Sequence, residues 1–137
     1  MKWYQLLWEL PQTLLGWIIY HCLSIDTQSM YNERLLIIFN RTNWFSRLIS
    51  GVSLGLYILL PLTSSSQNSI KHEYGHCVQS RQWGWLYLVV IGLPSIINNL
   101  FDRIFHTTWS HVDRMRWYYR RWPEQQADLL GGVVRNA

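Results

Sequence analysis

The sequence predicts one domain of the α+β class, mostly helical, with a small sheet placed before a helix that carries an HExxH motif. Three observations support this. A chain of 137 residues has room for one hydrophobic core and too little for two ordinary domains, so residues 1–137 are expected to form a single unit. Two short runs with strand character occupy residues 34–40 and 51–60. From residue 69 onward the patterns are helical.

The composition points to a membrane rather than to nucleic acid. The chain has nine Trp and eight Tyr, and only 15% of its residues are charged, where a soluble domain has about a quarter. Its net charge of +4 suits an anionic partner, but the Lys/Arg and aromatic pattern of an RNA-binding sheet is absent. We therefore expect membrane lipid as a partner and no nucleic acid. So much apolar sequence also makes a homo-oligomer an alternative.

Residues 3–23 predict a helix that contacts the membrane. The segment is apolar and rich in Trp and Tyr, which are enriched at membrane interfaces. Polar residues and a proline interrupt it, namely Glu9, Pro11, Gln12 and His21. We expect a helix that lies in or crosses the membrane and that is kinked or begins at Pro11. An amphipathic helix packed on the core is the alternative.

The next segments predict a small antiparallel sheet or hairpin. Residues 24–33 are polar and read as a connector, whereas residues 34–40 form a β-prone apolar run. Within residues 51–60, apolar residues alternate with Ser53, Gly55 and Tyr57, which is the period of a strand. An extended peptide could add itself to an exposed edge of this second strand. An ordinary core strand is the alternative.

A helix expected over residues 69–82 carries His72-Glu73-Tyr74-Gly75-His76. Histidines four residues apart lie on the same face of a helix, so both rings can reach one metal ion. Glu73 lies one step round the helix and could act as a general base on a water bound to that metal. His72, His76 and Glu73 thus form the pattern of a zinc metallopeptidase.

A second motif supplies a third ligand. Residues 123–131 predict a helix with Pro123 at its start and a glycine pair at its end. Glu124 and Asp128 are four residues apart and share a face. A catalytic zinc takes three protein ligands and an open position, so Glu124 completes a His-His-Glu set. Asp128 could accept the free ring N–H of His72 or His76.

HExxH followed by ExxAD resembles the gluzincin metallopeptidases, particularly the membrane-embedded zinc proteases of the CAAX-prenyl-protease and HtpX type. The resemblance implies a minimal zincin-like domain that hydrolyses a peptide or protein, with Zn²⁺ on His72, His76 and Glu124, Glu73 as base, and Asp128 outside the ligand set. At 137 residues the chain cannot build the substrate chamber of the large members.

Two further resemblances concern the glycine in the motif and the chain as a whole. His-Glu-x-Gly-His is also typical of site-2 proteases, but their third ligand comes from a Leu-Asp-Gly motif that this chain lacks. Most of the chain resembles a group of short uncharacterised bacterial membrane proteins with HEYGH and ExxADxLGG motifs. That second resemblance implies no activity.

Residues 83–101 form the longest uncharged stretch and are long enough to span a bilayer. A straight span would separate His76 from Glu124, and the arginines that follow could not cross back. We therefore expect the stretch to re-enter at Gly92-Leu93-Pro94, to lie in the interface, or to be core. In the re-entrant arrangement Arg81 and Arg103 flank the hairpin on one side, which the positive-inside rule predicts to be the cytoplasmic side of a bacterial inner membrane.

The sequence leaves the oxyanion donor and the activity open. Four residues after the apolar stretch could stabilise a developing oxyanion: His106, His111, Tyr118 and Tyr119. The alternative to an enzyme is a non-catalytic membrane or partner-binding protein with a structural zinc site, in which coordination would be closed. A membrane protein whose motifs coincide by chance is the remaining alternative.

Overall fold

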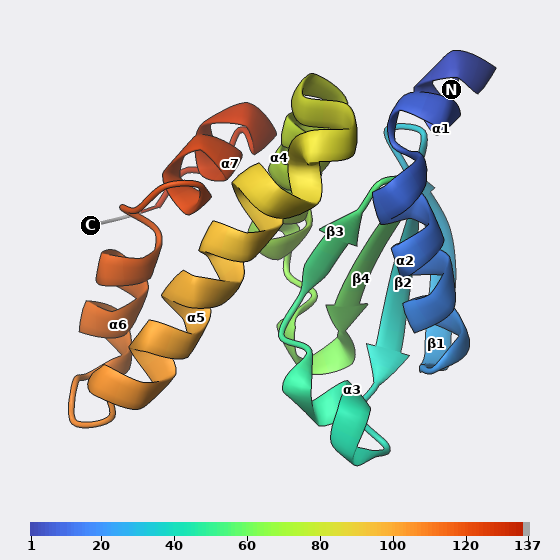
Figure 1. Cartoon of the computed structure of the whole chain (residues 1–137). Coiled ribbons are helices and arrows are strands. Elements are labelled where there is room, and N and C mark those ends of the chain that lie inside the picture. Colours follow the sequence, from blue (N-terminus) through green and yellow to red (C-terminus); the bar gives the residue numbers. More distant parts are fainter. Residues whose placement is uncertain (136–137) are drawn as a thin grey trace.

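The structure is a computed structural model that describes residues 1–135, and it has the predicted α+β architecture (Figure 1). Helices and strands follow one another in the order α1 (Trp3–Trp8), α2 (Leu10–His21), β1 (Ser24–Tyr31), β2 (Arg34–Asn40), α3 (Trp44–Leu48), β3 (Val52–Leu54), β4 (Tyr57–Pro61), η1 (Leu62–Ser64), α4 (Gln67–Trp83), η2 (Gly84–Leu86), η3 (Leu88–Gly92), α5 (Leu93–Phe105), α6 (His111–Tyr118) and α7 (Glu124–Gly131).

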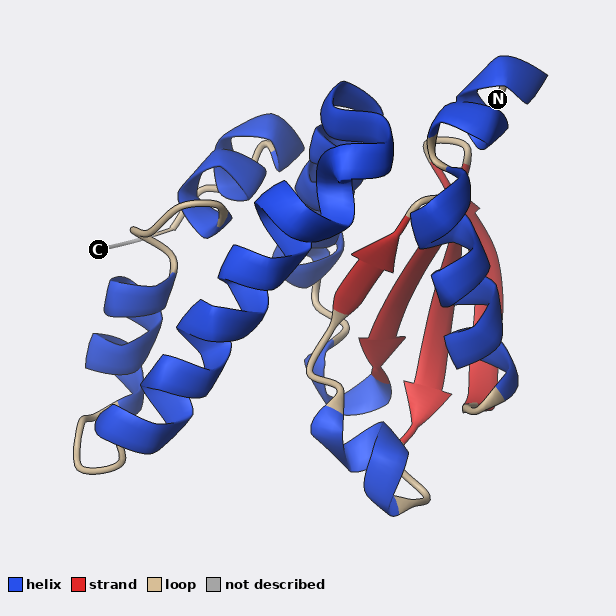
Figure 2. Ribbon diagram, in the orientation of Figure 1, coloured by secondary structure: helices blue, strands red, loops and turns tan. Residues whose placement is uncertain are grey.

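The sheet is mixed and has four strands in the order β1-β2-β4-β3. Figure 2 shows the strands side by side, with the last three helices to their left. β2 runs parallel to β4, and the other two pairings are antiparallel. The expected antiparallel pairing of residues 34–40 with residues 51–60 is therefore wrong. The loop that contains α3 is long enough to return the chain in the parallel direction.

Residues 51–60 are a hairpin and not one strand. Gly55 has a φ of +59°, and the two-residue turn that it begins places Leu54 opposite Tyr57. A glycine enters this region of φ without steric cost, so the chain reverses here although the apolar alternation continues across the turn. Consequently β4 is an interior strand, and only β3 forms an edge of the sheet near α4.

Residues 24–33 are also not a connector, because residues 24–31 form strand β1. β1 is an edge strand whose side chains are almost all exposed, so it lacks the apolar alternation that usually reveals a strand. A two-residue turn at Asn32 and Glu33, both with positive φ, joins it to β2. Sequence patterning fails here because neither face of β1 is buried.

Helices cover both faces of β2 and β4, which explains why β2 is apolar at consecutive positions. One face packs on α4 through a cluster that includes Leu36, Ile58, Ile70 and Cys77. The opposite face packs on α2 through a cluster that includes Ile37, Phe39, Leu59 and, half-buried, Ile19 and Tyr20. α4 is thereby fixed against the sheet.

The segment expected as one helix over residues 3–23 is two helices separated at Glu9. Pro11 is near the start of α2, as proline at an early helical position allows. Glu9 is fully buried and forms a bidentate ion pair with buried Arg34, at 3.1 Å for each oxygen. The charge that interrupts the apolar segment therefore lies inside the protein, with its partner on β2.

The chain makes no hairpin at Gly92-Leu93-Pro94, because η3 continues directly into α5. Residues 88–105 form one helix that is long and apolar enough to cross a membrane by length and composition, with a mean hydropathy of 1.4. Only 11% of this window is buried, so the segment is not core. The re-entrant and core arrangements are therefore wrong, and an interfacial helix stays a prediction.

After α5 the chain turns back, and α6 runs beside α5 toward α4 (Figure 1). α7 then packs on α4 at two glycines. A Cβ on Gly75 would overlap the carbonyl of Ala127, and a Cβ on Gly131 would overlap that of Lys71. The two helices can approach this closely only because these positions lack side chains. This contact brings the second motif onto the first.

Candidate metal centre

α4 holds both histidines of the HExxH motif on its buried side. The helix begins two residues earlier than expected, because Ser66 caps it by accepting a hydrogen bond from the backbone N–H of Ser69. The ring centroids of His72 and His76 are 4.8 Å apart, and the residues are only 5% and 6% exposed. The four-residue spacing thus gives the shared face that it predicts.

Glu124, the first residue of α7, completes a buried group of three. Its Oε2 lies 3.0 Å from Nε2 of His72 and 3.1 Å from Nε2 of His76. All three candidate ligand atoms lie within 4.8 Å of one another, so His72, His76 and Glu124 could hold a metal ion. Ligand atoms around a tetrahedral zinc lie roughly 3.3 Å apart, so a small shift of these side chains admits that ion.

The other ring nitrogen of each histidine is bound by the protein. His72 Nδ1 donates to Asp128 Oδ1 at 2.7 Å, and His76 Nδ1 donates to Gln79 Oε1 at 2.7 Å. A proton fixed on Nδ1 leaves the Nε2 lone pair for a metal. Asp128 is in turn bound by Arg135, whose Nη2 donates to Oδ1 at 2.9 Å. Both rings are therefore oriented toward one point.

Gln79 and Ser95 were not identified from the sequence. The amide of Gln79 also donates to the Pro123 carbonyl at 3.0 Å, which joins α4 to the start of α7. The Ser95 hydroxyl donates to Oε1 of Glu124 and leaves Oε2 for the metal. The i, i+3 spacing from His76 could have suggested Gln79. The contact of Ser95 could not have been foreseen, because it requires α5 to pass beside α7.

The group is electrostatically coupled. Burial disfavours the charged form of His72 and would lower its pKa. The hydrogen bonds to the Asp128 and Glu124 carboxylates outweigh this effect and raise the pKa of His72 to about 9. The pKa of His76 is raised too, because Glu124 outweighs the effect of burial. Burial opposes charge on Glu124 as well, but the two imidazoles lower the pKa of that carboxyl. A metal that binds here must displace protons.

Glu73 lies beside the three ligand residues and is 7% exposed. Its Oε2 and its backbone carbonyl oxygen lie 2.8 Å and 2.7 Å from the Ser53 hydroxyl, whose single proton is shared between these two acceptors. A Cβ added to Gly51 would lie 2.9 Å from Oε1 of Glu73, so the carboxylate occupies space that a side chain at position 51 would need. Strand β3 thus fixes the carboxylate of the expected general base, and Ser53 is a further contact that the sequence did not reveal.

The edge of β3 is partly occupied. The Tyr87 hydroxyl donates to the Ser53 carbonyl at 2.8 Å. Because Ser53 pairs opposite Ile58 outside the hydrogen-bonded positions of the hairpin, its carbonyl points away from β4. An extended peptide that added to this edge would meet Tyr87 at that position.

Two of the four expected oxyanion donors lie next to ligand residues. Tyr119 packs edge-on against His72, with ring centroids 5.0 Å apart. Tyr118 is half-buried, and burial and nearby Glu124 raise its pKa. Burial likewise raises the pKa of Tyr119 to about 12. Both phenols therefore keep their proton at neutral pH.

The two histidine candidates lie elsewhere. His106 is stacked on Trp109 with ring centroids 3.8 Å apart, and its Nδ1 donates to Asp102 at 3.0 Å. Its ring also packs edge-on against Trp117 of α6, so it joins α5 to α6, and it does not belong to the metal group. His111 is exposed and lines a cavity of about 660 Å³. Asp128 and Tyr119, which both contact His72, line the same cavity. Arg116 and Arg120 line the same cavity.

Comparison of the chain with protein-family models, with curated proteins and with solved structures found no match.

Proposed function

We propose that this protein is a membrane-associated zinc metallopeptidase. The buried group of His72, His76 and Glu124 carries the proposal. Two imidazoles and one carboxylate are a standard ligand set for a catalytic zinc, and a second acidic residue, Glu73, is buried on the same helix as the two histidines. The gluzincin motifs in the sequence agree with this assignment. The proposed location, the cytoplasmic side of a bacterial inner membrane, rests on the resemblance to short bacterial membrane proteins and on the net charge of +4, which suits the anionic cytoplasmic leaflet.

In this proposal each residue has a defined task. His72, His76 and Glu124 would hold the zinc, which would supply the Lewis acidity for activating a water molecule and polarising a carbonyl. Glu73 takes a proton from the attacking water and passes it to the leaving amine. Ser53 holds the Glu73 carboxylate in place. Tyr118 or Tyr119 donates a hydrogen bond to the developing oxyanion.

Metal content and hydrolysis test the proposal on the full chain, purified in mild detergent. We expect near-stoichiometric zinc in the wild type and its loss in His72→Ala. Glu73→Gln should keep the zinc and lose peptide hydrolysis. His21→Ala serves as the control, because His21 is exposed on α2 and should change neither. Wild-type protein without zinc would contradict the proposal, as would hydrolysis that persists in Glu73→Gln.

A structural zinc site is the second candidate, and the burial of the ligands favours it, since Glu124 is fully buried and both histidines nearly so. X-ray absorption separates the two. A catalytic centre gives three protein ligands and an exchangeable water, whereas a structural centre gives closed coordination by protein atoms. In the structural case the zinc would raise the unfolding temperature without any hydrolysis.

A further inference from the structure

Helix α5 turns an apolar side outward. Exposed residues recur every three or four positions, which places them on one face of the helix. All are between 51% and 64% exposed: Leu93, Ile96, Ile97, Leu100, Ile104 and Phe105. The stripe continues through η3 and η2, where Val89 and Trp85 are also exposed.

The opposite side of α5 is polar and bound to the protein. Ser95 donates to Glu124, and the amide of Asn98 donates to the Trp122 carbonyl at 2.7 Å. Asp102 is buried and accepts a hydrogen bond of 2.8 Å from Arg114. A spanning helix is surrounded by lipid or by other apolar helices, whereas this helix has only one side free for lipid. It fits the plane of a membrane interface.

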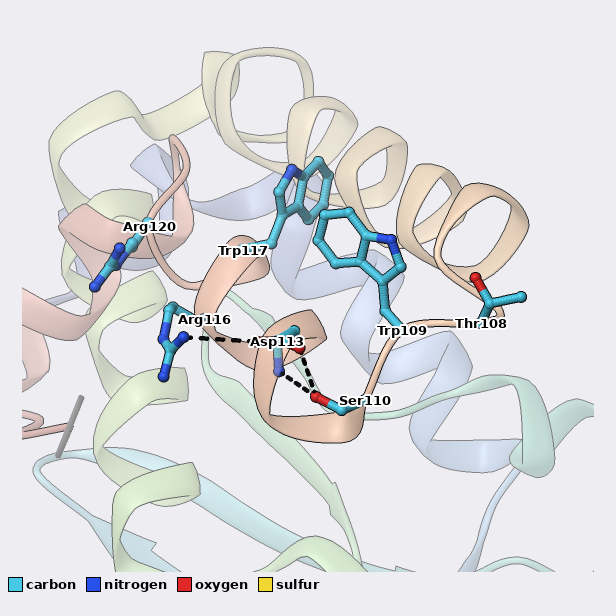
Figure 3. Close-up of a pocket in the computed structure, with 7 residues that line it drawn as sticks. All are labelled: Thr108, Trp109, Ser110, Asp113, Arg116, Trp117 and Arg120. Carbon is cyan, nitrogen blue, oxygen red and sulfur yellow. Dashed lines mark hydrogen bonds and ion pairs between the residues drawn. The ribbon is translucent and has the colours of Figure 1, made fainter.

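A cationic cavity lies beside the C-terminal half of α5, where Trp117 of its lining stacks on Phe101 with ring centroids 5.4 Å apart. Its volume is about 630 Å³, and Figure 3 shows the indoles of Trp109 and Trp117 on its upper side and Arg116 and Arg120 beside it. Arg120 is exposed, and Arg116 forms a 3.5 Å ion pair with exposed Asp113. Two guanidinium groups next to indoles provide donors for a phosphate and a surface of the kind found at membrane interfaces.

We propose that α5 lies in the plane of a bilayer and that Arg116 and Arg120 bind the phosphate of an anionic phospholipid in this cavity. The acyl chains of that lipid lie against the apolar stripe, and Trp117 of the cavity lining connects the two through its contact with Phe101. The net charge of +4 complements an anionic surface. This proposal goes beyond the peptidase assignment and uses none of the metal ligands, so Glu73→Gln should bind vesicles as the wild type does.

Vesicle flotation of the full chain tests the lipid site. Vesicles of phosphatidylcholine alone are compared with vesicles that also contain phosphatidylglycerol. For Arg116→Gln/Arg120→Gln we expect the partition coefficient on the anionic vesicles to fall about thirtyfold, roughly fivefold for each arginine. Arg41→Gln/Arg47→Gln removes the same charge from α3 and the turn that precedes it; Figure 1 shows α3 away from α6, so this control should have a much smaller effect. Equal losses in the two variants would overturn the site.

A second variant tests the apolar stripe. Ile97→Glu/Ile104→Glu should abolish binding to both kinds of vesicle while the far-ultraviolet circular dichroism stays unchanged. Unaltered binding would show that this face does not meet lipid. If the wild type does not bind vesicles and these changes instead convert a dimer to a monomer by light scattering, then a second copy of the chain covers the stripe, and the proposal is wrong.

Depth measurements distinguish an in-plane helix from a spanning one. Single fluorophores are placed at Leu93→Cys and Ile104→Cys in a Cys22→Ser background, where Cys77 stays buried in the core. An in-plane helix predicts similar quenching of both fluorophores by lipids brominated at one depth. Quenching profiles that place the two positions at depths separated by most of the length of α5 would refute the in-plane arrangement.

Discussion

His72 and His76 each bind the protein through one ring nitrogen and direct the other toward the same point. Their partners differ, since Asp128 is a carboxylate and Gln79 is a neutral amide. A carboxylate partner raises the basicity of its histidine, while an amide fixes only the orientation and the tautomer. Loss of Asp128 should therefore change the basicity of His72, whereas loss of Gln79 should change only the orientation and tautomer of His76.

Gln79→Ala should lower the affinity for zinc by about ten- to a hundredfold and leave the fold intact. The change frees the His76 ring and removes the link from α4 to the Pro123 carbonyl. Gln82→Ala is the matched control, because Gln82 is exposed on the same helix. Competition with a fluorescent chelator measures the affinity, and equal affinities for the two variants would contradict the assigned role.

The raised pKa of His72, about 9, predicts a defined dependence on pH. Between pH 6.5 and 9 the folded protein holds a proton on His72 that the unfolded chain has lost. The stability of the EDTA-treated protein should thus be highest below the ordinary pKa and should fall as the pH rises toward 9. Urea unfolding at several pH values measures this, and a free energy of unfolding that rises over the same range would refute it.

Zinc affinity should change in the opposite direction, because the metal replaces the proton on Nε2. It should increase up to about pH 9 and level off above the pKa of His72. Calorimetry in two buffers of different ionisation enthalpy reports the protons released. No proton release near neutral pH would mean that His72 does not bind the metal.

At the scale of elements, the crossing of α4 and α7 decides whether a metal centre exists. The crossing depends on Gly75, which explains the glycine in the HExxH motif without reference to catalysis. Gly75→Ala should destabilise the protein by about 1–3 kcal/mol and weaken zinc binding, since the helices must separate. Gly92→Ala is the control, because its nearest atoms would be 3.9 Å from the new Cβ. Equal stability of the two variants would argue against this crossing.

The ion pair of Glu9 and Arg34 holds the first helices to the sheet. Arg34→Met leaves the Glu9 carboxylate buried without its partner and should lower the free energy of unfolding by about 3–5 kcal/mol. Replacing Glu9 with Leu as well should recover much of that loss. Urea denaturation measures both, and a double variant less stable than Arg34→Met would show that the pair is not the cause.

At the scale of the whole molecule, the metal group lies directly behind the helix proposed to meet lipid. Ser95 on α5 reaches Glu124, while the next two residues, Ile96 and Ile97, are exposed. A helix is about 10–12 Å across, so a peptide held at the bilayer surface would be within reach of Glu73. This arrangement rests on both proposals.

A peptide tethered to vesicles should therefore be hydrolysed faster than the same peptide in solution, because tethering raises its effective concentration. Ile97→Glu/Ile104→Glu should remove this advantage and leave hydrolysis of the free peptide unchanged. Equal rates for tethered and free peptide in the wild type would show that the site does not face the surface.

The sequence alone predicted the α+β class, the HExxH helix and the residues of the metal group, because these follow from helical periodicity and from the chemistry of ligands four positions apart. Tertiary structure decided the rest. It paired β2 with β4 in parallel and divided residues 51–60 at Gly55. It also placed Gln79 against His76, Ser95 against Glu124 and Ser53 against Glu73. Such contacts join segments far apart in the chain, and only the packing of helices and strands brings them together.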